Sequence, residues 1–167
     1  MSAASGARVV VLDTHVVLDW LWFDDPRVQP LSHGVREGAL HWQGTLAMRA
    51  ELASVLGRGI LPARPRSANQ VLADYDRWCH PADAAPPEPK RLGPAHDTPG
   101  GFQALQPAPR CADPDDQKFV DLGWILAAWR GAAWLLTRDR AVLRLARPAR
   151  AQGLWIGPPE RWSDPAG

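Results

Sequence analysis

Two patterns of apolar positions alternate along the chain. In the first, apolar residues follow one another without interruption, as at 9–12, which is typical of a short strand buried on both faces. In the second, apolar residues recur at i, i+4, i+7 and i+8, as they do from Met48, which is typical of a helix with one buried face. This alternation predicts an α/β fold with a central parallel sheet of about four to five strands and helices on both faces.

Residues that begin or end helices stand between these stretches. Asp24-Asp25-Pro26 favours the end of one helix and the start of the next, and Thr45 is a typical N-cap. Strands are expected at 8–12, 40–42, 132–137 and 153–156, and helices at 16–23, from 26 to about 37, after Thr45, at 65–79, from 113 to 129 and at 141–146.

Prolines and glycines crowd into residues 81–109, where the apolar periodicity is lost. Proline lacks the N–H that regular elements need, so a long surface loop is expected here, with one short strand near 102–105. A loop of this length in a compact domain is either disordered or functional. We therefore expect one domain over 8–157, which contains the 81–109 loop insertion, and a polar C-terminal tail over 158–167.

The composition, 46% hydrophobic and 22% charged over 167 residues, is that of one globular domain. No apolar stretch approaches the roughly 20 residues of a membrane-spanning helix, and residues 1–7 lack the features of a signal peptide. We therefore expect a cytoplasmic protein without a membrane segment. Cys79 and Cys111 are too far apart for a CxxC motif and fit that compartment. The net charge of +1 indicates no overall preference for nucleic acid, although arginines crowd into 58–66 and 138–150.

Carboxylates stand at the ends of two expected strands. Asp13 closes the first apolar run, and Asp139 follows the run at 133–137 by one residue. Ligands bind at the C-terminal edge of the strands in open α/β sheets, and Glu51 and Asp116 add two more acids from expected helices. If the four acids converge, they would bind a divalent cation, and oxygen ligands indicate Mg²⁺ or Mn²⁺.

The helical acids differ in what the local sequence implies. Glu51 follows Met48 by three residues and precedes Val55 by four, so it lies on or beside the apolar face of its helix. An unpaired carboxylate there would be costly, and a metal ion would resolve that conflict. Asp116 begins a helix that is apolar almost all round. An acid at this end also interacts favourably with the positive end of the helix dipole. Local sequence leaves both interpretations of Asp116 open, a metal ligand and an ordinary helix start.

The order of these motifs resembles that of the PIN domain ribonucleases, and among them the toxin components of bacterial toxin–antitoxin systems. The resemblance covers nearly everything from Val9 to Ile156. The matching pieces are VLDTHV at 11–16, MRAEL at 48–52, DPDDQKF at 113–119 and LTRDRAVL at 136–143. By this resemblance four acids are the metal ligands and one hydroxyl supports them: Asp13, Glu51, Asp116, Asp139 and Thr137. Asp115 is an alternate ligand or supports the site from outside.

The resemblance implies a metal-dependent endoribonuclease that hydrolyses RNA phosphodiester bonds with Mg²⁺ or Mn²⁺ and without a protein nucleophile. A toxin of this kind would pair with a small cognate antitoxin protein, and the fold often forms homodimers. Side chains close to the acids are candidates for contact with the RNA substrate: Thr14, His15, Lys118 and Arg138.

Two features depart from the family pattern. His15 stands where many relatives carry asparagine, and the loop at 81–109 is longer than relatives usually have. Both favour the alternative of a non-catalytic PIN-fold module that binds RNA or protein. Glu51 opposes that alternative, because a chain freed from metal binding has no reason to keep an acid on an apolar helix face. A haloacid dehalogenase-like phosphatase needs a second acid at position 15 and is not expected.

The chain also holds nine tryptophans. Trp124, Trp129 and Trp134 fall in segments with the pattern of buried core. We therefore expect these indoles to pack in the core or in a dimer interface and not to stack on nucleic-acid bases.

Overall fold

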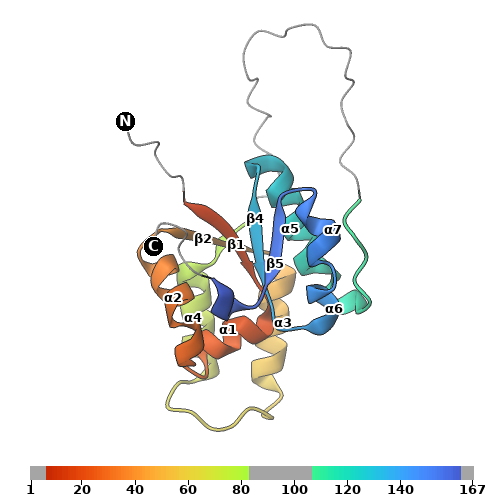
Figure 1. The fold of residues 1–167 in the computed structure, drawn as a ribbon. Helices are drawn as coiled ribbons and strands as arrows, with labels where there is room; N and C mark the ends of the chain where they lie inside the picture. Colours follow the sequence, from red (N-terminus) through yellow and green to blue (C-terminus); the bar gives the residue numbers. More distant parts are fainter. Residues whose placement is uncertain (1–6, 83–106, 163–167) are drawn as a thin grey trace, which may run out of the picture.

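The computed structural model describes residues 7–82 and 107–162, and at its centre lies a five-stranded sheet in which every pair of neighbours is parallel (Figure 1). The strand order is β3-β2-β1-β4-β5, so the first strand of the chain lies between β2 and β4. The expected α/β fold is confirmed. The strands are β1 (Arg8–Leu12), β2 (Leu40–Gly44), β3 (His80–Pro81), β4 (Ala133–Leu136) and β5 (Leu154–Gly157).

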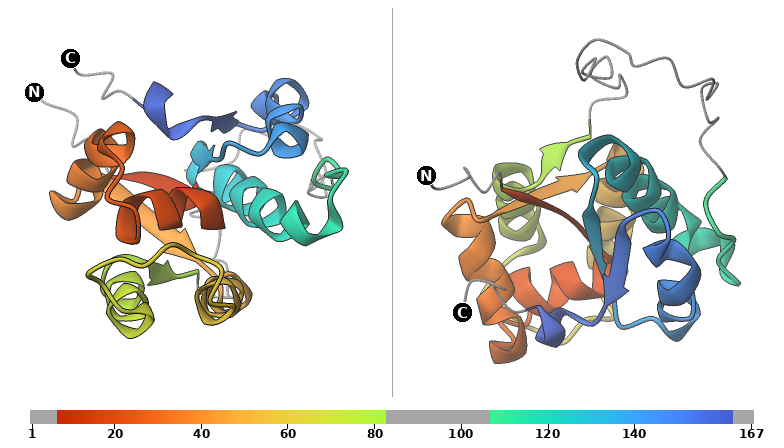
Figure 2. Two further views of the ribbon diagram at one scale, coloured as in Figure 1. Left: turned by 90° about the horizontal axis from the view of Figure 1, so that it is seen from below. Right: turned by 45° about the horizontal axis from the view of Figure 1, so that its top comes forward.

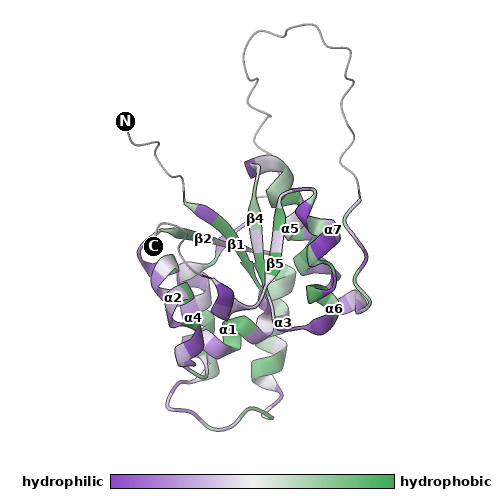
Figure 3. Ribbon diagram, in the orientation of Figure 1, coloured by the Kyte–Doolittle hydropathy of each residue, from purple (hydrophilic) through white to green (hydrophobic). Residues whose placement is uncertain are grey.

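Strand β1 is buried on both faces. Side chains alternate along a strand, so Val10 and Leu12 enter the apolar cluster on one face of the sheet, and Val9 and Val11 enter the cluster on the other. All four are at most 5% exposed. This double burial explains the uninterrupted apolar run in the sequence. In Figure 3 the central strands are accordingly coloured as hydrophobic over most of their length, and the hydrophilic colours lie mainly on the surrounding helices.

Helices cover both faces of the sheet (Figure 2). Helices α1, α2 and α4 contribute to the cluster that contains Val10, α5 contributes to the cluster that contains Val11, and α3 contributes to both. Helix α7 packs against β5. The helices are α1 (Thr14–Leu21), α2 (Gln29–Arg36), α3 (Leu46–Gly57), α4 (Ala68–Trp78), α5 (Gln117–Arg130), α6 (Arg140–Leu143) and α7 (Ala146–Arg150), with 3-10 turns η1 (Pro26–Val28), η2 (Pro114–Asp116) and η3 (Pro159–Arg161).

Two short elements were not expected. Strand β3 has only two residues, too few for an apolar pattern, and helix α7 contains Pro148, which a helix tolerates only near its start. The helix expected at 65–79 begins at Ala68, because Ser67 and Gln70 form a capping box there. The strand expected near 102–105 lies outside the described residues. Within the described ranges, no helix is long and apolar enough to cross a membrane.

The segment after β5 returns to the sheet. Within the tail expected at 158–167, η3 follows β5, and the ring of Trp162 meets that of Trp134 edge-on with centroids 5.9 Å apart. The tryptophans that were expected to pack in the core or in a dimer interface differ in their exposure. Trp124 is buried at 8% exposure, whereas Trp129 is 38% exposed. Apolar periodicity identifies a helix but does not reveal which of its faces remains uncovered.

Candidate functional site

The pairing of β1 with β4 brings two polar side chains together at the C-terminal ends of these strands. Leu12 is the register partner of Leu136, and the backbone N–H of Asp13 continues the pairing by donating to the Leu136 carbonyl at 3.1 Å. The next residue along β4 is Thr137. Its Oγ1 donates to Oδ2 of Asp13 at 2.5 Å. Both side chains are buried, at 0% and 3% exposure.

Thr137 also positions Asp139. The Thr137 Oγ1 accepts a hydrogen bond from the Asp139 backbone N–H at 2.9 Å, so one hydroxyl holds two of the predicted acids. Asp139 is the N-cap of α6, and its Oδ1 accepts from the N–H groups of Ala141 at 2.6 Å and Val142 at 3.1 Å. The second carboxylate oxygen of Asp139 takes no part in this cap.

Removal of the Thr137 hydroxyl should destabilise the fold by about 2 kcal/mol, because Thr137→Val leaves a buried carboxylate oxygen and a backbone N–H without their partner. Urea unfolding at pH 7 in EDTA measures this change. Thr137→Ser keeps the hydroxyl and serves as the control, with a smaller loss. Equal unfolding midpoints for Thr137→Val and the wild type would show that the bridge contributes no stability.

Glu51 reaches the site from α3. Its Oε1 accepts from Thr14 Oγ1 at 2.7 Å, and its Oε2 forms an ion pair with Lys118 Nζ. Thr14 is the first residue of α1 and Lys118 belongs to α5, so Glu51 joins helices from three parts of the chain. The expected conflict of an acid near an apolar helix face is thus answered in part by a hydroxyl and a cation. Two of the predicted substrate contacts, Thr14 and Lys118, have Glu51 as their partner.

Asp116 has a different environment. It ends η2 and precedes α5, and its carboxylate does not cap that helix. Burial and then the negative charges of Asp13, Asp139 and Asp113 raise the pKa of Asp116 to about 6, against a smaller opposing effect of Lys118. Its negative form is therefore disfavoured, although Asp116 keeps partial contact with solvent. Three of the predicted acids thus influence one another through their charge.

Asp13 shifts in the opposite direction. Burial disfavours its charge, but hydrogen bonds from His15 and Thr137 outweigh this effect, so the pKa of Asp13 is lowered. The His15 backbone N–H donates to Oδ1 at 3.2 Å, and the ring Nδ1 lies 3.8 Å from the same oxygen. The pKa of His15 is raised, mainly because the ring interacts with the Asp13 carboxylate. Partial burial lowers this pKa, and the negative charges of Asp116 and Asp139 raise it further. The imidazole itself is 81% exposed and points to solvent beside the acids.

The donor chemistry fits Mg²⁺ or Mn²⁺. Within the described ranges, no three Asp, Glu, His or Cys side chains lie close enough to ligate one ion. Magnesium does not require three, because it keeps several waters and is usually held through one or two carboxylates. A cation near Asp13, Asp116 and Asp139 would relieve the repulsion that raises the Asp116 pKa. The donor chemistry therefore fits a hydrated divalent ion that is held through one or two of these carboxylates. Glu51, which pairs with Lys118, lies on the neighbouring helix α3.

Arg138 has two acidic partners that sequence reasoning missed. Its guanidinium pairs with Asp19 of α1 and donates from Nε to Oε1 of Glu160 at 2.8 Å. Glu160 also lies 3.9 Å from Arg27 Nη1. No local signal marks these pairs, since the partners are far apart in sequence. The contact between Arg138 and RNA stays a prediction. In the structure the Arg138 side chain joins the segment after β5 to α1, and Glu160 joins that segment to η1.

Comparison with known proteins supports the interpretation of this geometry. A sequence profile described as PIN domain matches residues 9–141, a stretch that contains all four acids and Thr137. No curated protein and no solved structure matches the chain. PIN domains are generally nucleases that use divalent metal ions and bind RNA. With its parallel sheet and the acids at the strand ends, the chain belongs to the PIN domain family.

Proposed function

We propose that this protein is a Mg²⁺- or Mn²⁺-dependent endoribonuclease. The observation that carries the proposal is that Asp13 and Asp139, at the ends of β1 and β4, act through their charge on Asp116. Burial first, and then these negative charges, raise the pKa of Asp116 to about 6, so a cation is favoured at this place. The four acids, Glu51 included, are proposed as metal ligands, and Thr137 as the residue that orients two of them.

A bound divalent ion would supply a water of lowered pKa as nucleophile and would stabilise the charge on the leaving oxygen. The protein groups have separate tasks. Thr137 fixes Asp13 through its hydroxyl and holds the Asp139 backbone, so these two carboxylates are already oriented before a ligand binds. His15 carries an exposed imidazole whose raised pKa favours the cation, which suits contact with an RNA phosphate.

Lys118 has a role that changes when metal binds. In the metal-free protein its ammonium neutralises Glu51. If Glu51 ligated a metal ion, that charge would no longer be needed there, and Lys118 would become available for an RNA phosphate. This exchange accounts for a cation beside the acids without conflict with the proposed metal site.

The proposal is tested by incubating purified protein with a mixed-sequence single-stranded RNA in Mn²⁺, in Mg²⁺ and in EDTA. Cleavage is expected with either metal and absent in EDTA. Asp139→Asn, purified in the same way, is the control for contaminating nucleases, because an asparagine oxygen preserves the α6 cap but not the charge. Equal cleavage by this variant, or cleavage in EDTA, would contradict the proposal.

The further proposal of a toxin with a small antitoxin partner rests on the resemblance of the motifs to those of toxin components. Induced expression of the wild type should arrest bacterial growth, and the Asp139→Asn variant should not. Normal growth with an enzyme that is active in the cell lysate would exclude the toxin role and leave the nuclease.

Tight RNA binding without cleavage in any metal would instead identify the non-catalytic module. An RNA substrate, a homodimer and a cytoplasmic location remain predictions.

A further inference from the structure

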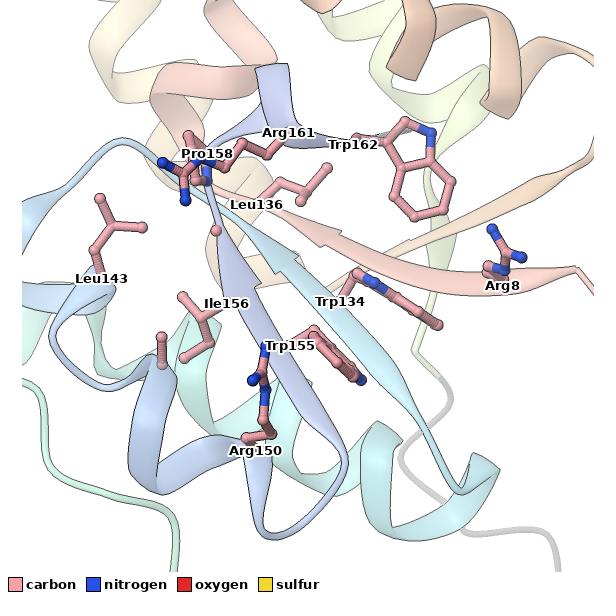
Figure 4. A pocket seen from close by; sticks show the side chains of 12 residues that line it. Arg8, Trp134, Leu136, Leu143, Arg150, Trp155, Ile156, Pro158, Arg161 and Trp162 are labelled. Atoms are coloured by element: carbon pink, nitrogen blue, oxygen red, sulfur yellow. The ribbon is translucent and has the colours of Figure 1, made fainter. Parts of the chain in front are cut away.

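A second feature lies on the face of β4 and β5. A pocket of about 710 Å³ opens there, and segments from both ends of the chain line it (Figure 4). Trp134 of β4 and Trp155 of β5 are register partners, so their indoles leave the sheet on the same face. Trp162 stands edge-on to Trp134 at the other wall. Three indoles in one hollow form an unusually aromatic surface.

The aromatic surface is not sealed. Trp155 is 43% exposed, which is high for the largest apolar side chain on a sheet. The Arg150 guanidinium lies over its ring, with the Cζ atom 4.1 Å from the ring centroid. Figure 4 shows Arg150 beside Trp155, where both side chains border the opening. A flat ligand can therefore reach this indole without any movement of the sheet.

The charged side chains that line the pocket are all cationic among the residues that the structure describes. Arg8, Arg150 and Arg161 line it, and among the described residues its lining includes no Asp or Glu. Glu160, which adjoins Arg161 in sequence, is held by Arg138 outside the lining. The ligand that matches this surface is therefore anionic and carries flat apolar rings.

We propose that this pocket binds single-stranded RNA, with a base stacked on Trp155 and the adjoining phosphates facing Arg150 and Arg161. Stacking on aromatic rings combined with arginine contacts is how proteins hold single strands without reading their sequence. A guanidinium stacks on the flat face of a base as it does on an indole. A base can therefore add to the stack of Trp155 and Arg150, and both side chains keep a stacking partner.

The position of the pocket connects it to the proposed active site. Leu136 lines the pocket, and the next residue, Thr137, holds Asp13. Gly157, which also lines it, accepts a hydrogen bond from the Thr137 backbone N–H at 3.0 Å. The pocket and the acids thus share the C-terminal end of β4. The inference rests on the proposed nuclease function, since the strand bound here would be a part of the RNA that extends from the cleavage point.

The experiment measures binding apart from cleavage. Fluorescence anisotropy of a labelled single-stranded oligoribonucleotide of about 12 nucleotides is recorded in EDTA for the full chain. Trp155→Ala should weaken the Kd at least about fivefold, the loss typical of one stacked base, and Trp155→Phe should restore most of the affinity. The matched control is Trp129→Ala, which removes an indole of similar exposure from α5 and should stay within about twofold of the wild type.

Each outcome decides the inference. Trp155→Ala binding as tightly as the wild type, or no RNA binding by the wild type in EDTA, would overturn it, and so would equal losses for Trp155→Ala and Trp129→Ala. A changed oligomeric state in Trp155→Ala with unchanged RNA binding would make the pocket an interface between copies. Circular dichroism and thermal melting identify a misfolded Trp155→Ala. In that case Trp155→Leu, which keeps apolar bulk but has no aromatic ring, is compared with Trp129→Leu, and equal affinities for these two variants would overturn the inference. Cleavage in Mn²⁺ is measured separately. If RNA does not bind in the pocket, the proposed nuclease activity is unaffected. If RNA binds through Trp155 but is not cleaved, only the proposed nuclease activity is overturned.

Discussion

Asp13→Asn should reduce metal-dependent RNA cleavage by about 10³-fold, because loss of one charged ligand removes several kcal/mol of transition-state stabilisation and each 1.36 kcal/mol is a factor of ten. The asparagine keeps an oxygen that can accept from Thr137, so the end of β1 should retain its geometry. The measurement is the cleavage rate at saturating Mn²⁺. A rate within about tenfold of the wild type would exclude Asp13 from the proposed site.

The same substitution should also destabilise the fold on the order of 1 kcal/mol at pH 7. The folded protein lowers the pKa of Asp13, so its ionised form contributes stability above the unfolded pKa of 3.8, and this contribution is lost as the pH falls through the lower folded value. The difference between wild type and variant should therefore shrink in strong acid. Thermal melting in EDTA across pH measures it, and an equally stable variant at pH 7 would contradict the role of these hydrogen bonds.

Asp116→Asn should stabilise the protein in EDTA, although it should reduce metal-dependent cleavage about as strongly as Asp13→Asn does. The pKa of Asp116 is about 6 in the folded chain and 3.8 in the reference state, so its charge opposes folding fully above about pH 6 and not below about pH 4. With allowance for the partial exposure of this carboxylate, the gain is on the order of 1 kcal/mol at pH 8.

Thermal melting of wild type and Asp116→Asn in EDTA at pH 8 and at pH 4 tests this sign. The variant should melt higher at pH 8, and the two melting temperatures should meet at pH 4. Added Mn²⁺ should then stabilise the wild type more than the variant. A variant that melts lower than wild type at pH 8 would show that Asp116 is not under repulsion from Asp13 and Asp139.

The positions of Asp13 and Asp139 could be predicted because apolar runs mark where buried strands end, and parallel pairing places those ends side by side. The hydrogen bonds of Thr137 follow from the same register. The ion pair between Glu51 and Lys118 could not be predicted, because it depends on how α3 and α5 pack, and residue spacing does not report that.

The same limit explains the arginines and tryptophans. Arg138 adjoins Asp139 in sequence, yet its guanidinium pairs with Asp19 and Glu160, because the chain after β5 folds back toward α1. Trp134 has the apolar neighbours of a core residue, but its indole lines an open pocket with Trp155. Whether a strand face is covered depends on elements distant in sequence, and here the last described residues cover it only in part.

The place of β1 and β4 within the strand order has a consequence for how this protein tolerates local opening. Both strands have a neighbour on each side, whereas the two-residue β3 ends the sheet at one edge and β5 ends it at the other. Fluctuations begin at edges and at short elements, so the His80 amide, which is the only one in β3 because Pro81 has no N–H, should exchange with solvent far sooner than those of β1. The carboxylates at the ends of the inner strands are therefore attached to the part of the chain that opens last.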